Sequence, residues 1–269
     1  AGVALTGMEV VNELGSVQLL NIPSISAGIV ENWVINGNPS GAVALAIIGL
    51  VIVMTLIAYE RSLRNKSRRW MEDIGEGEST LWHLTGGREL LAQIITILPP
   101  ILTLGIPIFW MIENIQQINK GFNIELILLT TRSIALGIIA AIICIIASIF
   151  LSLTKRWGTS KLITSLTFLS GIGYAIPGTV LALGLYSFGG TPWKIAPLFL
   201  LIWGYSNRFL AVAKGGIDAS FERLSPSMDE AATGLGLNWI KVFQKVHLPL
   251  LKGPMGVGAL LVFVDTLKE

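Results

Sequence analysis

Five long apolar runs constrain this chain more than any other feature of its sequence. Each is long enough to cross the hydrocarbon core of a bilayer, about 30 Å thick, as a helix that rises about 1.5 Å per residue. Charged residues make up only 13% of the chain, about half of their usual share in soluble domains. We therefore expect an all-α polytopic membrane protein. The runs are Ala42–Tyr59, Leu90–Ile112, Leu129–Leu153, Ile163–Phe188 and Ala196–Ala213.

Two shorter apolar pieces, Ala1–Leu14 and Pro254–Glu269, lie at the ends of the chain and look cut short. They match one another at a constant offset of 256 residues, acidic positions included. The match predicts that the chain leaves one repeat and enters the next at the same place, as an internal fragment of a longer protein built from two halves. The matched pairs are Gly2 with Gly258, Ala4 with Leu260, Leu5 with Leu261, Glu9 with Asp265 and Glu13 with Glu269.

Lysine and arginine in the short loops predict the orientation of the runs, because cytoplasmic loops carry an excess of both. Basic residues cluster after Tyr59 and again after Leu153, whereas the loops 113–128 and 189–195 hold one lysine each. The clusters are expected in the cytoplasm and the two loops outside, which places residues 214–253 in the cytoplasm. Because orientation accounts for the clusters, we expect no nucleic-acid binding. The clustered residues are Arg61, Arg64, Lys66, Arg68, Arg69, Lys155, Arg156 and Lys161.

The segment from Ser227 to Gly236 carries the signals of a short helix. Ser227 is expected to cap its start, with Glu230 three residues later, as in a capping box. Gly236 is expected to end it in a left-handed turn. The plainest interpretation is that Glu230 only completes a capping box and that Gly236 only ends a helix.

A second short helix is predicted from Trp239 to His247. Asn238 is expected to cap its start. Pro249 is expected to set its end, because proline disfavours helical geometry in the residue before it. Helix, glycine, helix and proline then follow one another within a cytoplasmic loop.

The spacing of these residues resembles the EAA loop of ABC-importer permeases, which reads Glu-Ala-Ala, three residues, Gly, nine residues, Ile, one residue, Leu-Pro. Val246 stands where that loop usually has Ile. The resemblance implies a type I ABC importer permease fold, with parts of two six-helix repeats. In that family the loop sits in a groove of a separate ATP-hydrolysing subunit, and we call residues 214–253 the EAA-like loop. The residues that would inherit the coupling role are Glu230, Ala231, Ala232, Gly236, Val246, Leu248 and Pro249.

Three other stretches look most like the fused two-half permeases that import iron(III). This resemblance implies ferric iron as cargo, a dimer of ATPase subunits that binds ATP and magnesium, a periplasmic or extracytoplasmic substrate-binding protein, and a place among the lipids of the bacterial inner membrane. The alternatives are the same mechanism with thiamine, a phosphonate, sulfate or a polyamine as cargo, and an ion-driven secondary carrier without an ATPase. The stretches are Met8–Gly15, Tyr174–Gly184 and Val264–Glu269.

Under this interpretation the chain divides at a charged linker. Residues 1–59 are the C-terminal part of the first permease repeat, residues 60–89 are a cytoplasmic linker, and residues 90–269 are the second repeat, which includes the EAA-like loop and is truncated at its end. Residues 15–41 are too polar and too rich in glycine and proline to span. They are expected to form an external loop with one or two short helices and with Trp33 at the membrane interface.

Carboxylates inside apolar runs are candidates for the substrate pathway, because a charge in hydrocarbon is costly unless it is hydrated, paired or neutralised. Glu9 and Asp265 are such residues, and their oxygens suit a hard cation such as Fe(III). The alternative is that each pairs with a nearby basic residue and holds the two halves together. Tyr174 and Pro177 are further pathway candidates, the second as a hinge. Arg208 is expected to reach the membrane interface.

Several kinds of catalytic chemistry are missing from the sequence. It holds no phosphate-binding pattern G-x-x-x-x-G-K-[ST], no nucleophile beside a base and no zinc-binding helix. We therefore expect a chain that is not an enzyme and that binds no cofactor and no resident metal, with ATP hydrolysis left to the partner subunit. Cys144 is the only cysteine, which excludes a disulfide within the chain, and it is expected to be a small buried side chain.

Overall fold

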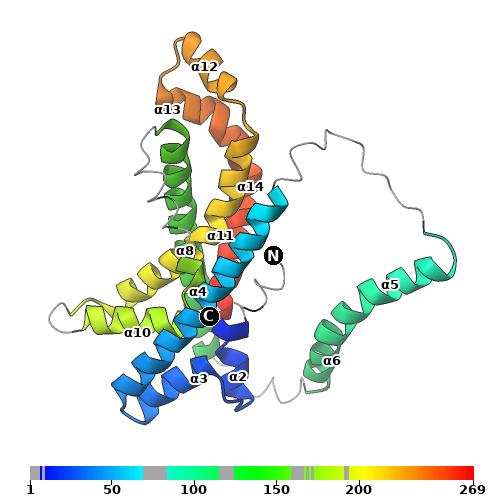
Figure 1. The fold of residues 1–269 in the computed structure, drawn as a ribbon, viewed down its shortest axis with the longest axis vertical. Helices are drawn as coiled ribbons and strands as arrows, with labels where there is room; N and C mark the ends of the chain where they lie inside the picture. Colours follow the sequence, from blue (N-terminus) through cyan, green and yellow to red (C-terminus); the bar gives the residue numbers. More distant parts are fainter. Residues whose placement is uncertain are drawn as a thin grey trace. The chain divides into compact units, whose positions relative to one another are not determined.

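The computed structural model describes residues 10–68, 84–114, 124–158, 173–190 and 194–269, together with Gly7, Thr167 and Ser170. All secondary structure in these ranges is helical, and the predicted all-α class is confirmed (Figure 1). Three π-helical turns and one 3-10 turn carry the labels η1 to η4. The elements are α2 (Gly15–Leu19), α3 (Ile25–Val30), η1 (Glu31–Ile35), α4 (Pro39–Arg68), α5 (Gly87–Pro100), η2 (Ile101–Gly105), α6 (Ile106–Glu113), α8 (Ile124–Trp157), η3 (Gly173–Ala175), α10 (Gly178–Gly189), α11 (Pro197–Arg223), α12 (Pro226–Gly234), α13 (Trp239–Val242), η4 (Phe243–His247) and α14 (Leu248–Lys268).

Four stretches of helix in the described ranges are long and apolar enough to cross a membrane. Three of them coincide with predicted runs: Pro39–Leu56 in α4, Gly87–Glu113 across α5 and α6, and Ile124–Trp157, which is α8. The fourth, Trp239–Lys268, runs from α13 through α14 and contains the predicted terminal piece. The length and composition of these helices agree with a multi-pass membrane protein.

The predicted run Ile163–Phe188 is not one spanning helix, and that prediction is wrong. Its described part begins with the single 3-10 turn η3, and the backbone is extended at Pro177, with φ −53° and ψ 135°. Only then does α10 begin, and its 12 residues rise too little to cross a bilayer. Proline offers no backbone N–H and disfavours helical geometry in the residue before it. The helix is therefore interrupted at Pro177, although the sequence around it is apolar.

α11 forms where a span was predicted at Ala196–Ala213, but it is not among the helices apolar enough to cross a membrane. Asn207 and Arg208 interrupt its apolar sequence. Arg208 is only 6% exposed and does not reach outward as predicted. The physical reason is a buried ion pair, because Arg208 Nη2 lies 3.0 Å from Glu269 Oε1. α11 therefore carries a buried charge where a purely apolar span was predicted.

The described chain forms two compact units. The first consists of Ala1–Ser67 and Ser133–Glu269, and the second of Arg68–Arg132. The second unit contains α5, η2 and α6, in which no described residue is buried. The domain boundaries predicted after residues 59 and 89 stay a prediction.

Small residues let α8, α11 and α14 pack closely in the first unit. Ala140 and Cys144 of α8 are fully buried and share one core with Ala213 of α11. On α14, a Cβ added to Gly258 would lie 3.4 Å from Ala213 Cα, so the backbones of α14 and α11 approach within van der Waals range. Such small residues are the usual means by which membrane helices come close. Cys144 is buried as predicted.

A smaller cluster joins α10 to the segment that was expected outside. Ile29 and Ala42 are buried there, and Trp33 packs against them. Trp33 also meets Tyr186 of α10 edge-on, with ring centroids 5.9 Å apart. The short helices predicted within residues 15–41 are present as α2 and α3, followed by η1.

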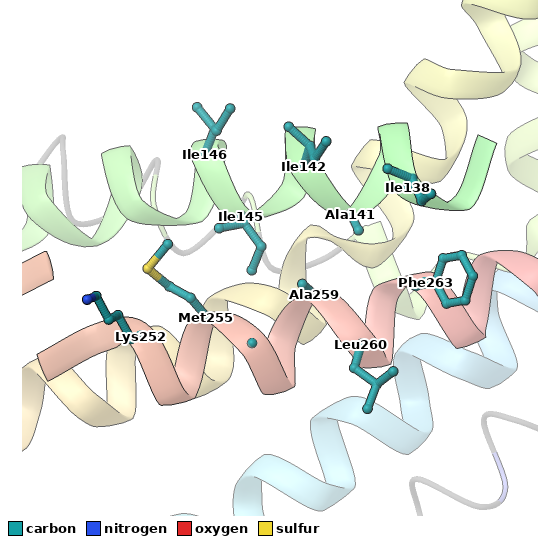
Figure 2. A pocket seen from close by; sticks show the side chains of 11 residues that line it. Ile138, Ala141, Ile142, Ile145, Ile146, Lys252, Met255, Ala259, Leu260 and Phe263 are labelled. Atoms are coloured by element: carbon teal, nitrogen blue, oxygen red, sulfur yellow. The ribbon is translucent and has the colours of Figure 1, made fainter. Parts of the chain in front are cut away.

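An apolar groove of about 640 Å³ lies between α8 and α14 (Figure 2). Ile138, Ile142 and Ile146, each four residues apart, line it from α8, and Phe263 lines it from α14. Lys252 is the only charged residue in this lining. Because Fe(III) prefers oxygen ligands, the groove is not suited to hold iron.

Candidate functional site

The EAA-like loop overlaps the end of α11 and the start of α14, and between them, in residues 224–247, it forms two short helices as predicted (Figure 1). Ser225, not Ser227, is the N-cap of α12, and its Oγ accepts a hydrogen bond from Ser227 N at 3.3 Å. Pro226 takes the first helical position, which its fixed φ favours. Glu230 is then the fifth helical residue and cannot complete a capping box, which needs the third. The predicted cap and the capping-box interpretation of Glu230 are therefore both wrong.

Gly236 ends α12 in a left-handed turn, as predicted, with φ +80°. Two backbone bonds form the Schellman pattern: Gly236 N donates to Thr233 O at 2.9 Å, and Leu237 N donates to Ala232 O at 3.2 Å. Nothing lies within 4 Å of a Cβ added at Gly236, so the need for glycine here is conformational and not steric.

Asn238 begins the second helix as predicted, because its Oδ1 accepts a hydrogen bond at 3.0 Å from the backbone N–H three residues on. Helix covers Trp239–His247 as α13 and η4. Pro249 does not end it, contrary to the prediction, and helical geometry continues through Leu248 (φ −58°, ψ −43°) into α14. In a regular helix the ring of Pro249 would clash with the carbonyl of Lys245, but Lys245 lies in the wider π turn η4, and this explains why the ring is tolerated. The loop is thus joined to a candidate spanning helix without a break.

The outer face of α12 and α13 is an exposed knuckle, which we define as Met228, Glu230, Leu235, Trp239 and Ile240. Its apolar side chains are between 38% and 84% exposed, the last being Leu235. Exposed apolar groups gathered on a short loop mark a surface for another protein. Of the residues predicted to couple, Glu230, Ala231, Gly236 and Pro249 are exposed, Val246 and Leu248 are half-buried, and Ala232 is buried.

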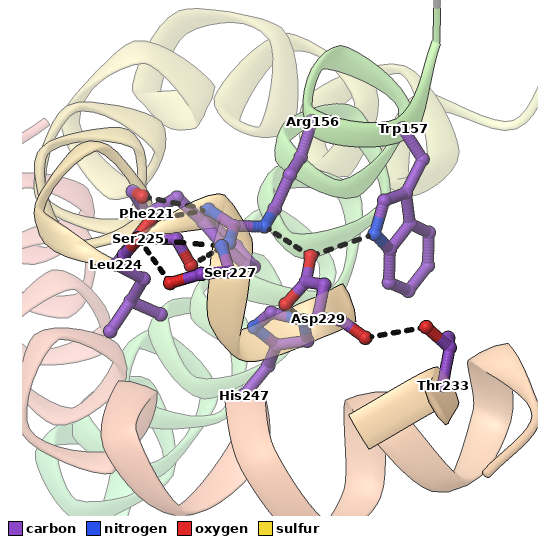
Figure 3. Close-up of polar contacts among 9 residues, drawn as sticks. All are labelled: Arg156, Trp157, Phe221, Leu224, Ser225, Ser227, Asp229, Thr233 and His247. Atoms are coloured by element: carbon purple, nitrogen blue, oxygen red, sulfur yellow. Dashed lines mark hydrogen bonds and ion pairs between the residues drawn. The ribbon is translucent and has the colours of Figure 1, made fainter. Parts of the chain in front are cut away.

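Asp229, next to Glu230 in the chain, is turned inward and joins α12 to the end of α8 (Figure 3). Arg156 Nε donates to Asp229 Oδ2 at 2.8 Å, and Trp157 Nε1 donates to the same oxygen at 3.2 Å. The Arg156 and Asp229 side chains are 12% and 17% exposed. Hydrogen bonds between ionised groups are among the strongest in proteins. We call Arg156, Trp157, Phe221, Asp229 and His247 the Asp229 cluster.

Arg156 also closes the C-terminal end of α11. Its Nη1 donates to Phe221 O at 3.0 Å and to Leu224 O at 3.1 Å, and its Nη2 donates to Ser225 O at 3.3 Å. Its guanidinium lies 5.7 Å from the centre of the Phe221 ring. Carbonyls at a helix end lack partners within the helix, and a cation there is favourable. One side chain from α8 therefore holds α11 and α12 at once.

His247 completes the cluster from η4. Its side chain is fully buried, and its ring lies 5.3 Å from the Phe221 ring and 5.8 Å from the Trp157 ring. Nε2 is 3.1 Å from Asp229 Oδ1, yet the two atoms are not aligned as a hydrogen bond, and neither ring nitrogen has a hydrogen-bond partner among the described residues. His247 contributes packing and a close polar contact.

The Asp229 carboxylate stays ionised despite its position. Burial opposes its ionisation, but hydrogen bonds from Arg156 and Trp157, together with the charge of Arg156, outweigh burial and hold the pKa of Asp229 below its ordinary value. The pair with Arg156 is therefore an ion pair at neutral pH.

The Asp229 cluster was missed by reasoning from sequence. The orientation argument accounted for Arg156, and His247 was considered only as the last residue of the second predicted helix. Asp229 and Ala232 are three residues apart and so share one face of α12, but only the structure shows that this face is buried. An acidic residue on the buried face of a short helix needs a cationic partner.

The pathway candidates lie apart from this cluster in the sequence. Glu9 is outside the described residues. Asp265 is 17% exposed, and its Oδ1 lies 3.1 Å from Lys268 Nζ, which is the kind of pairing that the alternative interpretation expects. In the described ranges, no group of three or more His, Cys, Asp or Glu side chains is placed to hold a metal ion.

Tyr174 and Pro177 lie on a segment that approaches α11 closely. Tyr174 packs against the main core, and Pro177 is buried. A Cβ added to Gly178 would overlap Arg208 Nη1, so this position admits only glycine without rearrangement. Close packing accounts for the glycine, and a hinge at Pro177 stays a prediction.

No family model matches the chain. The chain is similar to the Fe(3+)-transport system permease protein FbpB 2 of Haemophilus influenzae, with 24% identity over 279 aligned positions. The similarity covers 100% of this chain and 54% of that protein, so the chain spans about half the length of the curated relative. The predicted resemblance to iron(III) permeases is confirmed, and so, with the four apolar helices, is a multi-pass protein of the inner membrane.

Proposed function

We propose that this chain is the permease part of an ATP-driven importer, that ferric iron is its cargo, and that the EAA-like loop couples it to a separate ATPase subunit. One observation carries the proposal. The exposed knuckle presents apolar side chains and Glu230 outward, while the opposite face of the same loop is fixed to the ends of long helices.

The chemistry of the knuckle suits a groove in a partner protein. Leu235 and Trp239 are 84% and 65% exposed, and covering them would remove apolar surface from water. Glu230 adds a carboxylate that can meet a basic residue in the groove. An exposed Trp beside apolar and charged groups is typical of the centre of a protein interface.

Energy for transport then comes from the partner. When two ATPase subunits close on ATP and magnesium, their grooves move, and the knuckle moves with them. The helices attached to the loop tilt from an inward-facing to an outward-facing arrangement, which opens the route to a loaded external binding protein. The chain hydrolyses no ATP itself.

Ferric iron as cargo is supported by the similarity to FbpB 2, whose name states Fe(3+) transport. Within the membrane, we propose that Glu9 and Asp265 offer oxygen ligands to the passing ion, with Tyr174 and Pro177 beside the pathway. Lys268, which lies 3.1 Å from Asp265, would neutralise the carboxylate when no ion is present.

Cysteine crosslinking in the full-length permease tests the coupling role. Leu235→Cys places a thiol on the knuckle, and Leu19→Cys is a matched control, since the two leucines are 84% and 87% exposed and residue 19 is predicted outside. The native Cys144 is buried and interferes little. In whole cells, residue 235 is expected to capture an ATPase subunit and residue 19 is not. Absence of the ATPase from the products of residue 235 would overturn the coupling role.

The purified full-length complex decides the cargo. Binding proteins loaded with iron(III), thiamine, a phosphonate, sulfate or a polyamine are added one at a time, and iron is expected to give the strongest stimulation of ATPase activity. Transport that stops when an ion gradient collapses, and that survives deletion of residues 230–236, would instead support the ion-driven carrier.

A further inference from the structure

We propose that Arg156 and Asp229 are positioning residues that transmit movement of the knuckle to α8 and α11. This inference rests on the proposed function, because it assumes that the knuckle is moved by a partner. It adds that the movement reaches α8 and α11 through one ion pair, and not through the short peptide links at the ends of α12, whereas α13 passes it to α14 along unbroken helix.

The peptide links alone would transmit movement poorly. Only Leu224 and Ser225 connect α11 to α12, and the turn at Gly236 connects α12 to α13. Such short connections, one of them containing glycine, allow a helix to swing. Without side-chain contacts, α12 would move while α8 and α11 stayed in place.

The ion pair removes this freedom. Arg156 makes four hydrogen bonds, to Asp229 Oδ2 and to the carbonyls of Phe221, Leu224 and Ser225. A planar guanidinium bonded on several sides has one orientation. Because three of its acceptors belong to the end of α11 and the link after it, Arg156 fixes α12 to both long helices at the same point (Figure 3).

Further contacts carry the movement along α8 and α11. Lys155 Nζ lies 3.1 Å from Glu222 Oε1, one helical position from the Arg156 contact. A turn further along, Ser152 donates to Asp218, which also pairs with Lys214 at 2.9 Å. The contacts of Ser152 and Lys155 tie α8 to α11 over about one helical turn, so a push at Asp229 displaces the two helices together.

Adjacent residues thus divide two tasks. Glu230 is exposed and available to a partner, whereas Asp229 is held by Arg156 and Trp157. A change at Glu230 is expected to weaken association with the ATPase. A change at Asp229 is expected to leave association intact and to separate ATP hydrolysis from transport.

The test measures cargo transported per ATP hydrolysed by the full-length permease and its ATPase in lipid vesicles. Asp229→Asn and Arg156→Lys are expected to co-purify with the ATPase at the wild-type level and to lower this ratio at least about tenfold, because each breaks a poorly solvated ion pair or its fixed geometry. Glu230→Gln is the matched control and is expected to reduce co-purification instead. The double variant Asp229→Asn with Arg156→Lys is expected to lower the ratio no further than the stronger single variant, because both changes disrupt the same contact.

Trp157→Phe provides a milder test if Asp229→Asn does not yield assembled complex. It keeps an aromatic ring against His247 but removes the Nε1 donor to Asp229, and an intermediate fall in the ratio is expected. If the Asp229→Asn complex assembles and its ratio of cargo transported to ATP hydrolysed is unchanged, the transmitting role is overturned. If that complex does not assemble, an unchanged ratio in Trp157→Phe overturns it. Failure of the wild-type permease to bind any ATPase would instead overturn the proposed function, so the two failures are distinct.

Discussion

Asp229 and Glu230 are consecutive residues of α12, and their carboxylates lie in different environments. Asp229 Oδ2 accepts hydrogen bonds from Arg156 and Trp157 at 2.8 Å and 3.2 Å, whereas Glu230 lies exposed on the knuckle. Because successive residues of a helix point about 100° apart, a short helix can place one carboxylate inward and the next outward. The loop therefore has an inner face for attachment and an outer face for docking.

Loss of the Asp229 charge is expected to destabilise the protein. In Asp229→Asn, the Arg156 guanidinium keeps its charge in a site that is 12% exposed but loses its anionic partner. We expect a cost of about 2–3 kcal/mol. Thermal unfolding in detergent measures it, and Glu230→Gln, at an exposed neighbour, is expected to unfold like the wild type. Equal unfolding temperatures for Asp229→Asn and wild type would contradict an ion pair of this strength.

Acid should remove the stabilisation that the Asp229 charge provides. Because the pKa of Asp229 is lowered in the folded protein, its stabilisation is present above the ordinary aspartate pKa of about 4 and is lost as the pH falls through the lower folded value. The difference in unfolding temperature between wild type and Asp229→Asn is therefore expected to persist in mild acid and to shrink below about pH 4. A difference that disappears already near neutral pH would show that another group controls it.

Much of the site could be predicted from sequence because its signals are local. A cap at Asn238 and a left-handed turn at Gly236 depend on residues within one helical turn, and both are present. Pro249 shows the limit of local reasoning. Its effect depends on the π turn before it, which shifts the backbone to accommodate the ring. The Arg156–Asp229 contact joins residues 73 positions apart, and no local pattern reports it.

Apolar composition predicted the uniformly apolar helices well and the helix that carries a buried charge poorly. α4 and α8 are long apolar helices and match their predicted runs. α11 carries Arg208 in its middle. The charge of this buried side chain is tolerated because Glu269, 61 residues further along the chain, neutralises it. Hydropathy averages over a window and carries no information about such a distant partner, so the buried position of Arg208 could not be predicted.

Gly236 is expected to tolerate no side chain without cost, although space is available. Gly236→Ala forces a residue with a Cβ into φ +80°, at about 1 kcal/mol. Gly234→Ala is the matched control, because Gly234 is helical and has nothing within 4 Å of an added Cβ; it is expected to be neutral or stabilising. Thermal unfolding and ATPase co-purification are measured for both. Equal behaviour of the two variants would show that the turn conformation is unimportant.

Gly178 is expected to be intolerant for a steric reason. A Cβ there would overlap Arg208 Nη1 and displace the guanidinium from Glu269. Gly178→Ala is expected to cost about 1–3 kcal/mol and to reduce transport. Gly184→Ala lies in the same helix α10 with nothing within 4 Å of the added Cβ, and it should resemble the wild type. Unfolding temperature and iron uptake are compared, and full stability of Gly178→Ala would contradict the close approach.

Variants of Asp265 and Lys268 distinguish a role of Asp265 in the substrate pathway from a role in ion pairing alone. If its carboxylate serves only to neutralise Lys268, 3.1 Å away, then Asp265→Asn and Lys268→Gln each break the same pair and should lower assembly alike. If Asp265 provides oxygen ligands to a passing cation, Asp265→Asn should reduce iron uptake several-fold in assembled complex while Lys268→Gln retains most of it, because only the first change removes a negative ligand. We expect the second pattern. Uptake of labelled iron, normalised to complex recovered from the membrane, distinguishes them, and normal uptake by Asp265→Asn would exclude Asp265 from the pathway.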